Sequence, residues 1–413
     1  MIKDIFIRMF GIFISRFLIF ITSIIIARIV TEAEWGSISL TMSYFSLLLI
    51  FSGNILNRAV VTYTAQSINN IIYSNQILYL CNRLSVSIAF IIIIIFYLVL
   101  HLFSPISDKI AENGLITILP CIIIVLISQN IISYFQGRGN LKYMTILELL
   151  RSILQSIILV YFTYFMFGPL HGWVYGRLLG LIFIFTVFLI ILWKKYTIHI
   201  FHWPVIDKEI YYKIKRFFKW AYIASILSVA VRGVDVIIIS EYFNNSHFTG
   251  IFKLSIIFFT AFSLFGQSIT SALYHRFAKL ADRKKDLYNF SLKIKIITIP
   301  IYIIISVFLF IFSVEIIYLL FGDKYQLINR VINIIIIASI FNTYILINGG
   351  IWSAIGDMKL NTVYFSVYSI SYILLLFFTI SNYGFLFFPY SILIISILGA
   401  IYSELLLRKR LLF

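Results

Sequence analysis

The stretch LSVSIAFIIIIIFYLVLHLF, residues 84–103, decides the fold. It contains no Asp, Glu, Lys or Arg, and as a helix it is long enough to cross the ~30 Å hydrocarbon core of a bilayer. Similar apolar runs recur along the chain, which is 62% hydrophobic and only 12% charged. Strict alternation of polar and apolar residues, which marks the strands of a membrane barrel, is missing from these runs. Because only helices then satisfy the backbone in lipid, we predict an all-α polytopic membrane protein.

The apolar runs predict about twelve transmembrane helices. They are expected near residues 5–29, 37–57, 84–103, 115–135, 144–165, 173–193, 218–240, 250–274, 296–314, 329–352, 361–380 and 385–405. The first run carries Arg16 at its middle and is too long for a signal peptide. We therefore expect it to remain as the first helix.

The basic residues predict the orientation of the chain. The formal net charge is +17, from 33 Lys and Arg residues against 16 Asp and Glu residues. Most of the basic residues lie in connections on one side of the predicted spans, and the connections on the other side hold only Arg28, Lys109, Lys324 and Arg330. Because cytoplasmic loops are enriched in Lys and Arg, both termini are predicted to be cytoplasmic. The charge then fits topology and contact with anionic membrane lipids, and we expect no nucleic-acid partner.

A basic connection near the midpoint of the chain, residues 194–217, predicts a division into two lobes. Its apolar residues recur at helical spacing, at Ile206, Ile210, Ile214 and Phe217. This pattern is typical of an amphipathic helix at the cytoplasmic membrane surface. The predicted domains are a six-helix lobe over residues 1–193, this linker, and a six-helix lobe over residues 218–413. A second long cytoplasmic connection is expected over residues 275–295.

The sequence carries no motif for catalysis, a metal or a cofactor. Patterns of a nucleophile with its base, HExxH, a glycine-rich phosphate loop and paired catalytic carboxylates are missing. Cys81 and Cys121 lack metal-ligand spacing and are interpreted as packing residues. The six histidines lie at predicted helix ends and in connections. We therefore expect no metal site, no cofactor and no enzymatic activity.

Polar residues form one-sided stripes on several predicted helices. Close packing of helices explains the Ser, Thr and Gly positions on their own. Charged residues are different, because a charge at mid-bilayer costs at least ~2.5–3.5 kcal/mol and normally faces a bundle interior or an aqueous cavity. The candidate cavity cations are Arg16, Arg151, Arg232 and Lys253. The candidate polar or coupling residues of the cavity are Ser15, Asn57, Glu148, Asp235 and Gln267.

The candidate cations differ in their local neighbours. Arg151 and Arg232 each have an acidic residue three positions away on the same helix, and such pairs are able to neutralise each other. Arg16 and Lys253 have no acidic residue at that spacing. Arg177 lies close enough to a helix end for its guanidinium to reach the interface, so it is not among the candidates. A surplus of cations at membrane depth attracts an anion such as a phosphate or diphosphate, which Arg binds bidentately.

Several short motifs resemble a known family of membrane transporters. They are IIIARIV at 24–30, EAEWG at 32–36, FSG at 51–53, DVIII at 235–239 and YLLFGDKY at 318–325. Together they are similar to the Wzx-type O-antigen and polysaccharide flippases of the MATE-like (MOP) exporter superfamily. The resemblance implies two six-helix lobes around a central cationic cavity. It also implies a bacterial cytoplasmic (inner) membrane protein that moves a polyprenyl-diphosphate-linked oligosaccharide to the outer leaflet by alternating access.

For this chain, the resemblance implies a role in the synthesis of O-antigen, and hence lipopolysaccharide, or of another surface polysaccharide. The four candidate cations would hold the diphosphate, and the polar stripes would form hydrogen bonds with the sugars. The expected partners are this lipid-linked oligosaccharide and the membrane lipids, together with a polymerase and a chain-length protein of the same pathway.

Two other classes of function remain open at this point. A multidrug or cation exporter of the same superfamily would favour acidic residues in its cavity, whereas the candidate charges here are mainly basic. A polysaccharide polymerase or ligase is an enzyme of similar size that generally carries a large outer catalytic loop. The long connections of this chain are instead predicted to be cytoplasmic and basic.

The asymmetry of the basic residues predicts the outcome of reporter fusions. Fusions after positions 200, 285 and 413 should report the cytoplasm, and fusions near 110, 168, 245 and 383 should report the outer side. Paired phosphatase and fluorescent-protein reporters measure this directly. A clear outer signal from position 285 would contradict the twelve-helix topology.

Overall fold

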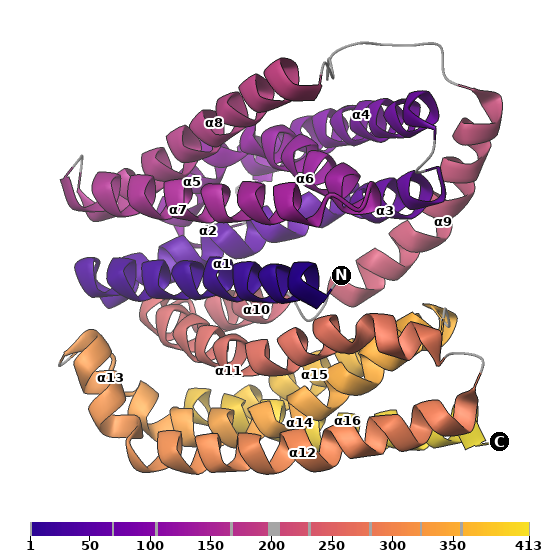
Figure 1. The fold of residues 1–413 in the computed structure, drawn as a ribbon. Helices are drawn as coiled ribbons and strands as arrows, with labels where there is room; N and C mark the ends of the chain where they lie inside the picture. The colour runs from indigo at the N-terminus through magenta and orange to yellow at the C-terminus, as the bar shows by residue number, and fades with distance from the viewer. Residues whose placement is uncertain are drawn as a thin grey trace. The chain divides into compact units, whose positions relative to one another are not determined.

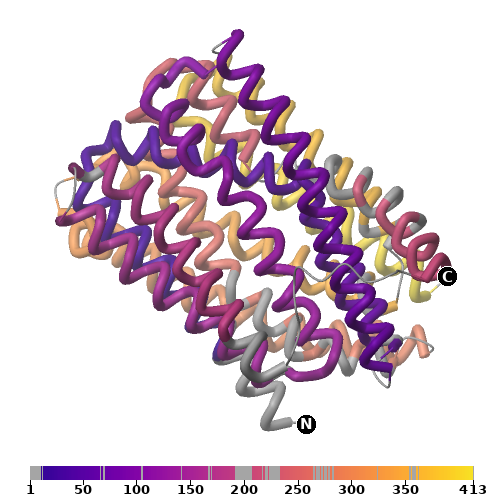
Figure 2. The backbone as a smooth tube through the Cα atoms, turned by 90° about the horizontal axis from the view of Figure 1, so that it is seen from above, coloured from indigo at the N-terminus to yellow at the C-terminus, as the bar shows by residue number. Residues whose placement is uncertain are grey.

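The structure is a computed structural model of the chain, and it is helical throughout the part it describes (Figure 1). It describes residues 2–67, 70–103, 106–165, 168–196, 207–229, 233–280, 283–322, 324–355 and 358–412. Contacts divide the chain into two compact units, Met1–Ser246 and His247–Phe413. Figure 2 follows the backbone through the same helices in a second view and shows no extended strand among the described residues.

The N-terminal unit contains the first ten helices. They are α1 (Ile2–Ile29), α2 (Glu32–Phe51), α3 (Leu56–Gln66), α4 (Ile71–Phe103), α5 (Lys109–Ile118), α6 (Cys121–Gly137), α7 (Leu141–Phe165), α8 (Pro169–Tyr196), α9 (Lys208–Val229) and α10 (Val234–Phe243). Helix α2 begins with a capping box, in which the Thr31 hydroxyl accepts from the Glu34 backbone and the Glu34 carboxylate accepts from the Thr31 backbone. The acidic start of the EAEWG motif therefore has a local structural reason.

The C-terminal unit contains the remaining helices. They are α11 (Ser246–Lys279), whose first residue belongs to the N-terminal unit, α12 (Lys284–Ile311), α13 (Ser313–Phe321), α14 (Ile328–Ala354), α15 (Met358–Tyr383), the 3₁₀ turn η1 (Phe385–Phe387) and α16 (Phe388–Leu412). Helices α12 and α14 both pack against α16 (Figure 1). Their shared core includes the fully buried Trp352 and Leu407.

The prediction of an all-α polytopic membrane protein is confirmed. In the described part of the chain, nine helices are long and apolar enough to span a membrane, or ten if the pair α5 and α6, bent by 53°, counts as one span. The predicted number of helices is recovered when α2 with α3, α5 with α6, α9 with α10, and α12 with α13 are each taken together. Between α2 and α3 the backbone turns at Gly53, with φ 87°, and it is buried there, as irregular backbone at membrane depth must be.

The second long connection, predicted over residues 275–295, is wrong. Helix α11 continues to Lys279, and α12 already begins at Lys284. Apolar runs mark only the part of a helix that faces lipid, whereas Lys and Arg are good helix formers and extend helices beyond the bilayer. The polar ends of these two helices were therefore mistaken for loop.

Helix α9 joins the second half of the predicted linker to the start of the predicted span 218–240, and its linker part packs on protein through part of the predicted apolar stripe. Ile210 and Ile214 are fully buried and join the core of the N-terminal unit with Leu56, Leu78 and Phe135. The opposite face is charged and exposed, with a salt bridge of 2.5 Å between the Lys213 ammonium and the Glu209 carboxylate. Ile206, the first residue of the predicted stripe, lies outside the described residues.

A buried ionic network ties α12, α14 and α16 together in the C-terminal unit. The Glu404 carboxylate on α16 accepts from the Lys295 ammonium at 2.6 Å and from the Tyr344 hydroxyl at 2.7 Å on one oxygen. Its other oxygen accepts from the Tyr288 hydroxyl at 3.1 Å and from the Arg408 guanidinium at 3.2 Å. The Lys295 ammonium also lies 4.5 Å from the centre of the Tyr344 ring. Since both charges are paired and hydrogen-bonded, their burial is tolerated.

The Glu404 network predicts a large loss of stability when one buried charge is left alone. The Lys295 side chain is 4% exposed and the Glu404 side chain 12%, and breaking a pair of this kind costs about 3–5 kcal/mol. We expect Glu404→Gln to lower the free energy of unfolding by that order, measured by SDS titration in mixed micelles. Arg408→Ala is the matched control, because Arg408 touches the same carboxylate but is half-exposed. Equal stability of Glu404→Gln and the parent would show that the pair does not hold the helices.

Candidate functional site

The candidate site begins with a close contact between α7 and α8. Two glycines one turn apart on α8, Gly176 and Gly180, face α7. A Cβ added to Gly176 would lie 3.0 Å from the Cβ of Phe162, and one added to Gly180 would lie 2.8 Å from the amide nitrogen of Gln155. This small-xxx-small spacing lets membrane helices approach closely. The side chains beside these glycines therefore meet the side chains of α7.

The two helices of this contact each carry an arginine. Arg177, from α8, and Arg151, from α7, lie within range of a repulsive interaction between their charges. Glu148, one turn before Arg151, supplies an attractive charge. Both arginines lie within helices long and apolar enough to span the membrane. The cluster of three charged groups therefore keeps a net positive charge.

Polar atoms around the arginine pair lack partners. The Gln155 side chain is 8% exposed, and neither its amide nitrogen nor its amide oxygen has a hydrogen-bond partner among the described residues. The Nε of Arg177 is also buried without an acceptor in that part of the chain. Burying such groups without hydrogen bonds costs free energy, and native proteins almost always satisfy them. The arrangement offers donors and positive charge to an anionic or hydroxyl-bearing ligand.

The remaining candidates of the N-terminal unit lie elsewhere on its helices. Arg16 is exposed and Ser15 half-buried on α1, a helix that packs along α7. Asn57, at the start of α3, is half-buried, and its side-chain amide is 3.4 Å from the Asn54 side chain. Asp235 is buried in the first turn of α10, where its carboxylate accepts from the Val236 backbone at 2.8 Å.

Three candidates are not joined to this cluster by the structure. Lys253 is half-buried on α11 in the C-terminal unit. Arg232 lies outside the described residues. Gln267 is part of α11, but its side chain also lies outside the described part. Among the described residues, the candidate cation Arg151 thus has a repulsive interaction with a second cation, Arg177.

Sequence reasoning missed Arg177, Lys295 and Glu404 for different reasons. The position of Arg177 near a helix end predicts that it reaches the interface, but the glycines at 176 and 180 mark its face as a packing face. The apolar run of α12 places Lys295 in a loop, because α12 begins earlier than that run. Its partner Glu404 is 109 residues away, and no local pattern joins the two.

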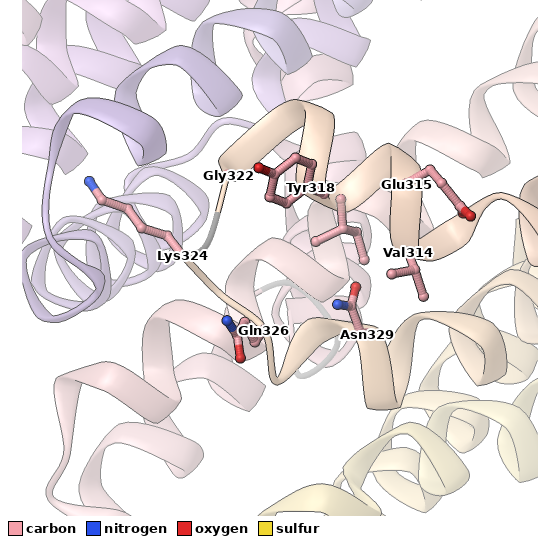
Figure 3. Close-up of a pocket in the computed structure, with 8 residues that line it drawn as sticks. Val314, Glu315, Tyr318, Gly322, Lys324, Gln326 and Asn329 are labelled. Carbon is pink, nitrogen blue, oxygen red and sulfur yellow. The ribbon is translucent and has the colours of Figure 1, made fainter.

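A hollow of about 280 Å³ lies in the C-terminal unit, between α13 and the start of α14 (Figure 3). Its lining residues are Val314, Glu315, Ile317, Tyr318, Gly322, Lys324, Gln326 and Asn329. The amide of Asn329 points toward α13 in this view. All lining residues lie between positions 314 and 329, a stretch that includes the YLLFGDKY motif at 318–325. Among the described residues, no three His, Cys, Asp or Glu side chains are grouped to hold a metal ion.

Solved structures of membrane transporters share this fold. An inward-facing multidrug resistance MATE family transporter of the MOP superfamily matches with a TM-score of 0.79 and 15% identity, over 96% of this chain and 94% of that one. An outward-facing structure of such a transporter matches with a TM-score of 0.72 and 13% identity, over 99% and 95% of the two chains. A mutant MATE transporter of Vibrio cholerae gives a TM-score of 0.70 and 14% identity, over 99% and 97%.

The fold and the apolar helices define a polytopic helical membrane protein with the fold of the MATE-type transporters. A family model described as "Polysaccharide biosynthesis protein" matches residues 25–330. The chain therefore belongs to this family of Wzx-type flippases, and the resemblance of its short motifs is confirmed. No curated protein matches the chain by sequence.

Proposed function

We propose that this transporter flips a polyprenyl-diphosphate-linked oligosaccharide across the bacterial cytoplasmic membrane for the synthesis of O-antigen or another surface polysaccharide. The observation that carries the proposal is the Arg151–Arg177 pair with its unpartnered polar neighbours, in a chain of the polysaccharide biosynthesis family. Transport proceeds by alternating access of two lobes around a central cavity. Both termini lie in the cytoplasm.

The chemistry of the pair suits a diphosphate. Two guanidinium groups on neighbouring helices repel each other, so an anion bound by both would relieve the repulsion and fill their donors. Arg also binds phosphate oxygens bidentately, which fixes the direction of the head group. The Gln155 amide would donate to a phosphate oxygen through its nitrogen and accept from the first sugar hydroxyl through its oxygen. Arg16, Arg232 and Lys253 are proposed as further cations along the path of the head group.

A multidrug or cation exporter is the alternative that the similar solved structures raise, because two of them are multidrug resistance transporters. The arginine pair disfavours it. A cationic drug near Arg151 and Arg177 would meet like charges in a low-dielectric environment, where repulsion is stronger than in water. A gain of drug resistance in cells that express the protein, without any effect on surface polysaccharide, would favour the exporter.

Removal of the Arg177 charge tests the proposal. If Arg177 contacts the diphosphate, Arg177→Ala should reduce transport by roughly tenfold to a hundredfold, since a hydrogen bond to a charged group contributes about 1.5–3 kcal/mol. Insertion should remain intact, because the change relieves Arg151 of a like charge. The measurement is surface polysaccharide in a strain that lacks its own transporter, normalised to the inserted protein. Arg151→Ala, Arg16→Ala and Lys253→Ala are compared in the same assay.

Two variants make this test specific. Arg177→Lys keeps the charge but loses the bidentate geometry, and we expect an intermediate rate. Arg330→Ala, at an exposed arginine near the start of α14, should leave transport unchanged. Normal polysaccharide from both Arg151→Ala and Arg177→Ala at normal abundance would overturn the anion site.

A further inference from the structure

One carboxylate joins three separate segments of the N-terminal unit. Asp108 precedes α5, and one of its oxygens accepts from the backbone amides of Ile110 and Ala111, at 3.0 and 3.1 Å, as a helix cap. Its other oxygen accepts from the hydroxyl of Ser37 on α2 at 2.6 Å and from the hydroxyl of Ser246 at 3.0 Å. The first oxygen therefore holds α5, and the second joins α2 to the turn between α10 and α11.

The same two segments touch through their backbones. A Cβ added to Gly36 would lie 1.7 Å from the carbonyl oxygen of Ser246, so any side chain at this position would push the turn away. Gly36 thus permits an approach that places the Ser37 and Ser246 hydroxyls on one oxygen. Further along α2, Ser43 lies beside Gly233, which precedes α10. Helix α10 therefore packs along α2 between the Gly36–Ser246 contact and the Ser43–Gly233 contact.

The two oxygens of Asp108 have separate partners, so the hydrogen bonds to one can break while those to the other remain. Release of Ser37 and Ser246 would free one oxygen of Asp108 and leave the α5 cap intact on the other. The freed hydroxyls and carboxylate oxygen would find water, because the contact lies at the end of the helices that the basic asymmetry predicts to be outside. No apolar side chain takes part in the two hydrogen bonds or in the Gly36 contact. Because the contact consists of polar groups and backbone, it can separate without exposing apolar side chains of its own to water.

We propose that Asp108, Ser37, Ser246 and Gly36 form an outer latch, which closes the α10–α11 turn on α2 and must release once in each transport cycle. The latch rests on the proposed transport function, because only a transporter needs its outer end to open. A permanent brace would have the same contacts, but it would tolerate being fixed covalently. The effect of a covalent cross-link therefore distinguishes a latch from a permanent brace.

The first experiment fixes the latch with a disulfide. Ser37→Cys and Ser246→Cys are combined, since both side chains converge on one oxygen and the native Cys81 and Cys121 are buried. We expect the oxidised protein to lose transport and the reduced protein to recover it. Each single cysteine variant, treated with the same oxidant, is the control and should keep transport. Full transport by the oxidised, fully cross-linked pair would overturn the latch.

The second experiment follows release without any substrate, so its result does not depend on the proposed function. A reporter cysteine at Ser43, 1% exposed, is labelled in intact cells with a membrane-impermeant maleimide. Ser246→Ala should raise the labelling rate by about tenfold, as expected when one hydrogen bond to a charged group is lost. Gly36→Ala should raise it too, because its Cβ pushes the Ser246 turn away. Ser23→Ala removes an exposed hydroxyl from α1 and should leave the rate unchanged. Unchanged labelling in both latch variants would overturn the proposal even if transport itself is confirmed.

Discussion

Every backbone amide and carbonyl within the hydrocarbon layer must find its partner inside the protein, and this constraint shapes the whole chain. It explains why the described residues form helices and why the interruptions are buried or placed near helix ends. Ser52 and Gly53, between α2 and α3, are enclosed by protein. Once the backbone is satisfied, the side chains decide which helices meet. Small residues such as Gly176 and Gly180 then determine where polar side chains from two helices come together.

The fold class was predictable because it follows from composition and from the length of apolar runs, which are local properties. Helix ends were less predictable, since Lys284 and Lys295 belong to α12 although they lie outside its apolar run. Broken helices such as α5 and α6 were read as one span, because an apolar run does not register a bend of 53°. The sequence therefore predicts that a span exists here but does not predict its bend.

The candidate site was predictable only in part. Arg151 stood out because a charge in an apolar helix is costly, and that reasoning needs one helix only. Its partnership with Arg177 depends on the register of α7 against α8, which two glycines determine and which no local charge pattern reveals. The contact of Ser246 with Asp108 joins residues 138 positions apart. The EAEWG motif contains a local and a distant contact. Glu34 caps its own helix, whereas Gly36 allows the close approach of the distant turn at Ser246.

The Lys295–Glu404 pair has a consequence for how the protein is made. Lys295 is made as part of α12, but its partner is synthesised 109 residues later, on the last helix. Because Lys295 lies at the polar end of α12, outside its apolar run, its ammonium remains in water or among lipid head groups during that interval and becomes buried only when α16 packs against α12. The C-terminal unit is therefore incomplete until the ribosome has released α16. A nascent chain that stalls before this helix displays an unpaired ammonium and an uncovered face of α12 and α14, two features that the finished protein lacks.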